Sequence, residues 1–122
     1  MNSEGSIADV IVVGSGPAGC AAALTCAKAG LHVIVITAQT DHDSSNRVES
    51  IHPGVVSLLD KIGIDGPEPQ CIFGYYEGIY TSGHYTALGE DVEETWQGLH
   101  IWRNKFDQQL NRPLRHRGIT IV

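Results

Sequence analysis

The sequence predicts an α/β fold built on a parallel sheet. Residues 9–13 and 32–36 each contain four β-branched residues in a row, a composition typical of strands covered on both faces. Between them, residues 17–29 are mainly good helix formers, and Gly30 supplies a helix stop. Residues 9–36 are therefore predicted to form one strand–helix–strand unit.

The later elements follow from local patterns. Residues 53–62 place apolar side chains at helical spacing and end at a glycine, which predicts an amphipathic helix. Glycines divide residues 63–95 into short runs, which predicts short strands and turns. Residues 99–102 are a predicted strand that leads into a helix, and Pro113 should break or kink that helix. Residues 119–122 begin another strand.

Composition excludes several classes of protein. The 122 residues carry a net charge of -6, which disfavours nucleic-acid binding. The basic residues Arg112, Arg115, His116 and Arg117 are interpreted as a solvated helix face. Three cysteines without CxxC spacing predict no disulfide framework and favour a reducing cytoplasm. The histidines show no metal-ligand spacing, and neither a secretory signal nor a membrane span is predicted.

The motif that carries chemistry follows the first predicted strand. Gly14, Ser15, Gly16, Pro17, Ala18 and Gly19 match the GxGxxG pattern and open a helix, which is the context that a dinucleotide-binding turn requires. Gly14 would allow the tight turn, Gly16 the close approach of a pyrophosphate, and Gly19 the close packing of helix on strand. Pro17 suits the first helical turn, where its missing N–H is not needed. The pattern predicts a Rossmann-like FAD/NAD(P)-binding fold.

The ribose end of the motif departs from the usual pattern. An acidic residue normally stands about 20 positions after the glycines and accepts hydrogen bonds from a ribose. Here the second strand ends at Thr37, followed by Ala38, and the first acid is Asp41 in a polar stretch, residues 39–46, that is predicted to be an exposed loop. The Thr37 hydroxyl could make one neutral hydrogen bond. A nicotinamide dinucleotide is therefore less favoured as the primary ligand.

Three segments together resemble a known family. Residues 9–36, with Pro-Ala between the second and third glycines, look like the amino-terminal FAD-binding unit of flavoproteins with two dinucleotide-binding domains. Residues 47–64 and 102–122 resemble later segments of flavin-dependent aromatic hydroxylases, geranylgeranyl-reductase-like enzymes and halogenase-like monooxygenases. The resemblance covers most of the chain except residues 65–98.

The resemblance implies FAD as the cofactor, with its pyrophosphate over residues 14–19 and its ribose near Thr37 and Ala38. Arg47 and Arg103 occupy positions that usually contact FAD in these families. The activity implied is a flavin-dependent oxidation in which NAD(P)H is the electron donor and O₂ oxygenates an apolar or aromatic small molecule. No catalytic residue is assigned.

Some interpretations stay open at this stage. Glu49 could line the cavity near the flavin or cap the helix that starts at Pro53. The aromatic residues 73, 75, 76, 80 and 85 could stack on a substrate, but interior packing is the favoured interpretation. Halogenation is disfavoured because residues 63–97 contain no lysine, whereas halogenases of this group carry an essential one.

The expected organisation is one partial Rossmann-type domain over residues 1–122, with an insertion at about 65–98. The resemblance implies later segments near the flavin and a substrate sheet that have no counterpart here, so we expect a missing carboxy-terminal half or a partner chain. Two alternatives to the oxidoreductase remain: a non-catalytic or truncated dinucleotide-binding module that needs a partner chain, and an NAD-binding dehydrogenase.

Overall fold

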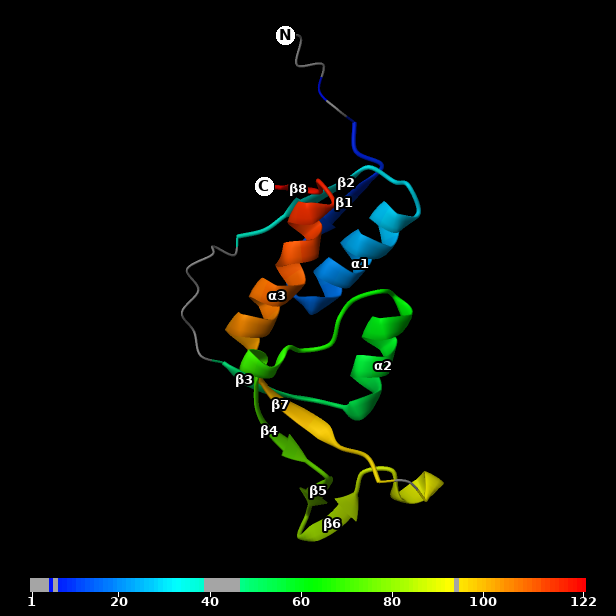
Figure 1. Ribbon diagram of the computed structural model, residues 1–122, viewed down its shortest axis with the longest axis vertical. Helices are drawn as coiled ribbons and strands as arrows, with labels where there is room; N and C mark the ends of the chain where they lie inside the picture. The colour runs from blue at the N-terminus through cyan, green and yellow to red at the C-terminus, as the bar shows by residue number, and fades with distance from the viewer. Residues whose placement is uncertain (1–4, 6, 39–46, 94) are drawn as a thin grey trace. The chain divides into compact units, whose positions relative to one another are not determined.

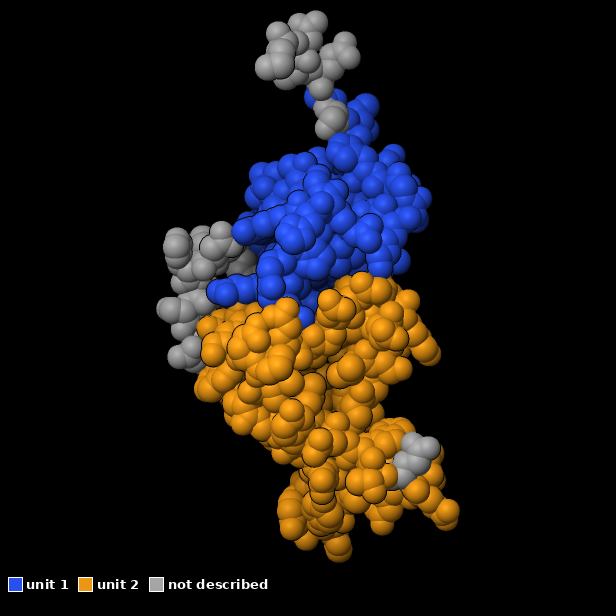
Figure 2. All heavy atoms as spheres, viewed as in Figure 1, with its two compact units in different colours: residues 1–44, 107–122 blue, residues 45–106 orange. Residues whose placement is uncertain are grey.

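Two compact units make up the chain in the computed structural model, which describes residues 5, 7–38, 47–93 and 95–122. The first unit comprises residues 1–44 and 107–122, and the second comprises residues 45–106 (Figure 2). The loop expected at residues 39–46 lies outside the described residues. Each unit has a sheet of its own.

The first unit contains a parallel sheet in the order β1-β2-β8, formed by Val10–Val13, Val33–Ile36 and Thr120–Ile121 (Figure 1). Val10 pairs with Val33, and Ile34 pairs with Thr120. The helix α1, Pro17–Lys28, connects β1 to β2. This arrangement confirms the predicted strand–helix–strand unit and the α/β fold class.

One face of this sheet is covered by helices. Val33 and Val35 of β2 are 2% and 0% exposed on the face where α1 and α3 lie (Figure 1). On the opposite face Ile11 and Val13 of β1 are 59% and 81% exposed. The apolar composition of both strand faces predicted that other elements would pack on both faces of the sheet. Among the described residues, helices pack on only one face.

The helix α3, Arg103–His116, passes through Pro113 without ending there, so the predicted break is wrong. A proline inside a helix costs about 3 kcal/mol through its missing N–H and its ring. Phe106, Leu110 and Leu114 of this helix are at most 2% exposed, and burying each such side chain contributes roughly 1.5–3 kcal/mol. Packing therefore outweighs the local penalty.

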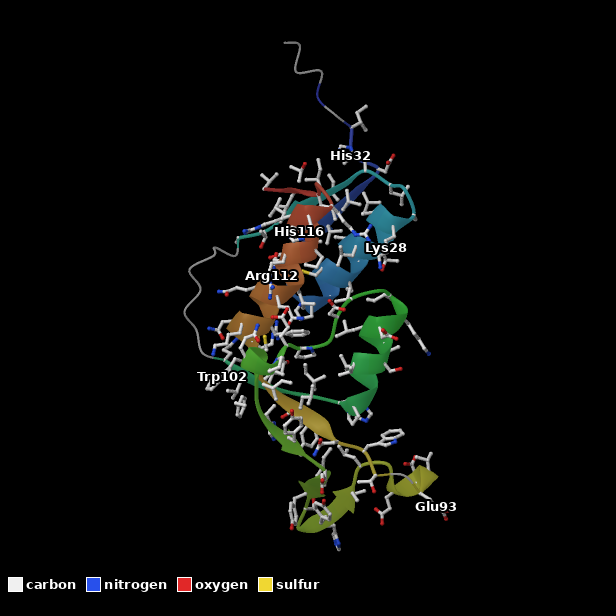
Figure 3. The ribbon with its side chains drawn as sticks, in the orientation of Figure 1. Lys28, His32, Glu93, Trp102, Arg112 and His116 are labelled. Carbon is white, nitrogen blue, oxygen red and sulfur yellow. The ribbon has the colours of Figure 1, made fainter. Side chains whose placement is uncertain are left out.

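The other face of α3 is solvated. Arg112 and His116, which Figure 3 labels, are exposed together with Arg115 and Arg117. This exposure agrees with the interpretation of the basic cluster as a solvated helix face.

The second unit contains an antiparallel sheet in the order β3-β7-β4, formed by Val48–Ile51, Gly98–Trp102 and Ile72–Tyr76. The register pairs Ser50 with His100 and Ile72 with Ile101. Alternate residues of each strand point to opposite faces, so one face carries the apolar core. Its buried members are Ile51, Leu59, Ile64, Cys71 and Ile101.

The predicted helix at residues 53–62 is confirmed as α2, Pro53–Lys61. Its N-cap is His52, whose Nδ1 accepts a hydrogen bond of 3.1 Å from the backbone N–H of Gly54. The interpretation of Glu49 as the cap of this helix is therefore wrong. A one-turn helix η1, Pro69–Cys71, then leads into β4.

A separate two-stranded hairpin joins β4 to β7 along the chain. Its strands β5, Gly78–Thr81, and β6, His84–Ala87, pair antiparallel, and the one-turn helix η2, Glu90–Val92, follows. Tyr80 and Tyr85 face each other across the strands with ring centroids 5.1 Å apart. They are 76% and 52% exposed, and Phe73 and Tyr75 are also exposed, so the interior packing favoured for the aromatic residues is wrong at these four. Tyr76 is half-buried, and its ring stacks on His100.

Replacing Pro113 with alanine should stabilise the protein. Pro113→Ala restores a backbone N–H to α3 and removes the ring clash, while the loss of proline's rigidity in the unfolded chain opposes part of this gain. We expect the free energy of unfolding in urea to rise by about 1–3 kcal/mol. Gln108→Ala, an exposed substitution on the same helix, should change it by less than about 0.5 kcal/mol. An unchanged or lower stability of Pro113→Ala would contradict this account of α3.

Candidate dinucleotide-binding site

The candidate site is the turn that joins β1 to α1. Gly14 has φ +102°, a left-handed conformation that only glycine adopts without strain. Its backbone N–H donates a hydrogen bond of 2.7 Å to the carbonyl oxygen of Ile36, at the end of β2. The turn is thereby fixed at the carboxyl ends of two neighbouring parallel strands, where ligands bind in open α/β sheets.

Gly19 allows α1 to approach this turn closely. A Cβ atom added at Gly19 would lie 2.0 Å from the carbonyl oxygen of Gly14, a backbone atom that cannot move aside without distorting the turn. The position therefore requires glycine for steric reasons. The close approach brings the first turn of α1 directly onto the end of β1.

The N-terminus of α1 is open to an anion. Gly16 is the N-cap and provides no side-chain cap, Pro17 occupies the first turn, and that turn contains no acidic residue. The N–H groups of Ala18 and Gly19 have no partner within the helix, because the first N–H groups of any helix lack one. Together with the positive end of the helix dipole they form the type of site that binds phosphate groups. In contrast, His52 caps α2.

Ser15 and Thr37 link the turn to the end of β2. Ser15 is 4% exposed, and its Oγ lies 2.8 Å from Oγ1 of Thr37 in a hydrogen bond. The backbone N–H of Thr37 donates to the carbonyl oxygen of Val122, 2.9 Å away, and Ala38 is exposed. The sequence-predicted residues 14–19 and 37–38 therefore belong to one local structure, in which the hydroxyl groups of Ser15 and Thr37 link the turn to the end of β2.

Asn111 of α3 also reaches the turn, and sequence reasoning missed it. Its Nδ2 donates a hydrogen bond of 3.2 Å to the carbonyl oxygen of Ser15. The thiol of Cys20 donates to the same oxygen, also at 3.2 Å. No sequence signal could identify Asn111, because it lies 96 positions after Ser15 and belongs to no motif.

The Cys20 thiol is unreactive at neutral pH. The side chain is 0% exposed, and burial, with a smaller contribution from the negative charge of Asp107, raises the pKa of its thiol to about 11. A thiol with a raised pKa is a poor nucleophile at neutral pH. Cys20 therefore acts as a small core residue and a weak hydrogen-bond donor.

The other two sequence-predicted residues, Arg47 and Arg103, belong to the second unit. The backbone N–H of Arg103 donates a hydrogen bond of 2.8 Å to the carbonyl oxygen of Arg47, which extends the pairing of β3 with β7. The guanidinium of Arg103 forms an ion pair with the carboxylate of Glu49. Because Glu49 is half exposed, this pair contributes at most about 1 kcal/mol to stability.

The residues of the turn fit a dinucleotide. A diphosphate is bound well by backbone N–H groups at a helix N-terminus, and the close approach of Gly19 to Gly14 places that terminus at the carboxyl end of the strands. Among the described residues, no group of three or more His, Cys, Asp and Glu side chains is placed to hold a metal ion. Nor does any helix in the described part of the chain have the length and apolar character needed to cross a membrane.

The raised pKa of Cys20 predicts a loss of stability at high pH. The unfolded thiol loses its proton near its ordinary pKa of 9.0, whereas the folded thiol keeps it up to about 11. The stabilising contribution is therefore complete below pH 9 and is lost as the pH rises to 11. We expect the free energy of unfolding in urea to fall by about 2 kcal/mol over this range.

The cysteine variants provide the control for this loss. Cys26→Ala should keep the decrease between pH 9 and 11, and Cys20→Ala should lack it. An equal decrease in both variants would assign the effect to other groups.

Comparison with known proteins shows what this site resembles. Residues 9–48 match the model of the FAD binding domain. Menaquinone reductase of Mycolicibacterium smegmatis is 36% identical over 91 residues, which cover 75% of this chain and 21% of the relative. Squalene monooxygenase of Panax ginseng is 36% identical over 96 residues, covering 74% of this chain and 17% of the relative. The chain thus spans about a fifth of the length of these curated relatives.

A solved structure agrees. The geranylgeranyl bacteriochlorophyll reductase-like protein of Thermoplasma acidophilum superimposes with a TM-score of 0.71 at 28% identity, covering 93% of this chain and 29% of that one. These matches confirm the Rossmann-like fold and the resemblance inferred from the sequence. The chain is similar to the FAD-binding portion of flavin-dependent oxidoreductases, FAD-dependent monooxygenases among them, and its cofactor is FAD.

Proposed function

We propose that this chain is the FAD-binding portion of a flavin-dependent, monooxygenase-like oxidoreductase. The activity uses NAD(P)H and O₂ on an apolar or aromatic small molecule, and residues 65–98 form an insertion in a partial FAD-binding domain. The observation that carries the proposal is the turn between β1 and α1. There Gly19 brings an uncapped helix N-terminus against Gly14 at the carboxyl end of a parallel sheet.

The binding chemistry follows from this turn. The pyrophosphate of FAD lies over residues 14–19, where backbone N–H groups and the positive end of α1 stabilise its charge. The adenosine ribose lies near Thr37 and Ala38, where the groups available for hydrogen bonding are uncharged. Arg47 and Arg103 provide guanidinium groups suited to phosphate oxygens. In this arrangement Glu49 holds the Arg103 guanidinium in place until the cofactor arrives.

Bound FAD supplies the electron transfer between NAD(P)H and O₂, and the residues of this chain bind and orient it. None of the described side chains is assigned as a catalytic acid or base. Cys20 is unsuited to such a role, because its pKa is raised to about 11 and the side chain is fully buried. The contribution of the chain is therefore positional and electrostatic.

A second candidate is a dinucleotide-binding module that acts only together with a partner chain. The observation that favours it is the uncovered face of the parallel sheet, where Ile11, Val13 and Ile36 are 59%, 81% and 42% exposed. Apolar side chains gathered on one sheet face normally mark a contact surface. Reduction of the FAD-loaded chain by NADH or NADPH distinguishes the two candidates.

The experiment is a titration of the purified chain with FAD, followed by flavin absorption and fluorescence. We expect saturable binding of one FAD per chain, and Arg103→Ala should weaken it by about tenfold because a charge-assisted contact to phosphate is lost. Arg115→Ala, an exposed substitution on the same helix, should bind FAD as the unmodified chain does.

The loaded chain is then mixed with NADH or NADPH without oxygen. Bleaching of the flavin absorption is the expected result for an oxidoreductase. A chain that binds FAD but is not bleached supports the module that requires a partner. If the purified chain is colourless and does not bind added FAD, both FAD-binding candidates are overturned for the chain in isolation.

A further inference from the structure

We propose that Asn111 is a positioning residue for the pyrophosphate-binding turn: its side-chain amide holds the Ser15 carbonyl so that the N–H of Gly16 stays directed toward the ligand. This inference rests on the proposed FAD-binding function of the same turn. It assigns a role to a residue of α3 that belongs to no dinucleotide-binding motif.

The first step is the geometry of the peptide bond. All peptide bonds of the described residues are trans, so the carbonyl of Ser15 and the N–H of Gly16 point in opposite directions. The Ser15 carbonyl is directed at Asn111 and at Cys20, each 3.2 Å away. Cys20 is fully buried, so this carbonyl points into the protein. The Gly16 N–H must then point away from that interior.

The second step concerns the stability of this orientation. The peptide is flanked by Gly16, which has no Cβ and for which a change in φ costs little. Rotation of the peptide would replace the N–H with a carbonyl oxygen at the surface that receives the phosphates. One donor would be lost and a partial negative charge would face the anion. A turn rich in glycine therefore requires an interaction that fixes this peptide.

The third step is the suitability of Asn111 for this task. Its Nδ2 group carries two N–H donors, of which one bonds to the Ser15 carbonyl and the other to the carbonyl of Asp107, 2.6 Å away and one turn earlier in α3. The second bond fixes the orientation of the amide. The Cys20 thiol is a weak donor, so Asn111 provides the stronger of the two contacts.

The binding test compares ADP with adenosine, which differ in the pyrophosphate that the Gly16 N–H would contact. Asn111→Leu, nearly equal in size to the original side chain, should weaken ADP binding by five- to tenfold, as expected for one lost hydrogen bond. Adenosine affinity should stay within twofold. Gln108→Leu, an apolar substitution at an exposed position of the same helix, should leave both affinities unchanged. Equal losses for ADP and adenosine would overturn the proposal.

A ligand-free measurement separates this inference from the proposed function. In the nuclear magnetic resonance spectrum, Asn111→Leu should shift the Ser15 carbonyl carbon and the Gly16 amide signals and should broaden or double the latter as the peptide gains freedom. Asn111→Ala serves as a second variant if the leucine variant does not fold, as judged by circular dichroism. Unchanged Ser15 and Gly16 signals would refute the role of Asn111, whereas failure of the unmodified chain to bind ADP would refute only the proposed function.

Discussion

The contact between Gly19 and the carbonyl of Gly14 is the constraint on which the first unit depends. Because a side chain at position 19 would overlap that oxygen at 2.0 Å, only glycine lets α1 begin so close to the end of β1. The close start places the helix N-terminus, with its uncapped N–H groups, at the carboxyl edge of the sheet. The left-handed Gly14 and its bond to Ile36 then fix the turn against β2.

The helix α3 also contributes a contact to this turn. The helix continues through Pro113 because Phe106, Leu110 and Leu114 are almost fully buried, and their burial exceeds the local penalty of the proline. The burial of Leu110 and Leu114 orients the helix segment that carries Asn111, whose amide donates a hydrogen bond to the Ser15 carbonyl. The buried apolar side chains of α3 thus set the orientation of the helix, and this orientation places Asn111 in contact with the turn.

The parts of the fold and site that could be predicted are those set by local sequence. The β-branched runs, the glycine turn and the helix stops specify the first strand–helix–strand unit without help from distant residues. The break at Pro113, the capping role of Glu49 and the burial of Tyr80 and Tyr85 were wrong because these outcomes depend on tertiary packing, which local sequence does not show. Glu49 pairs with Arg103 at the ends of β3 and β7, and Tyr80 and Tyr85 pair with each other on the hairpin, where both are exposed. Asn111 was missed for the same reason.

The ribose end of the site changes how the proposed affinity is distributed. The ribose position proposed next to Thr37 has no carboxylate among the described residues, so the hydrogen bonds that it offers are neutral and roughly half as strong as charge-assisted ones. More of the binding free energy must then come from the pyrophosphate, and hence from the orientation of backbone N–H groups in a turn of flexible glycines. A site built in this way depends on the residues that hold its backbone as much as on those that touch the cofactor. Ser15, which bonds to Thr37 through its hydroxyl and to Asn111 through its carbonyl, connects both ends of the site.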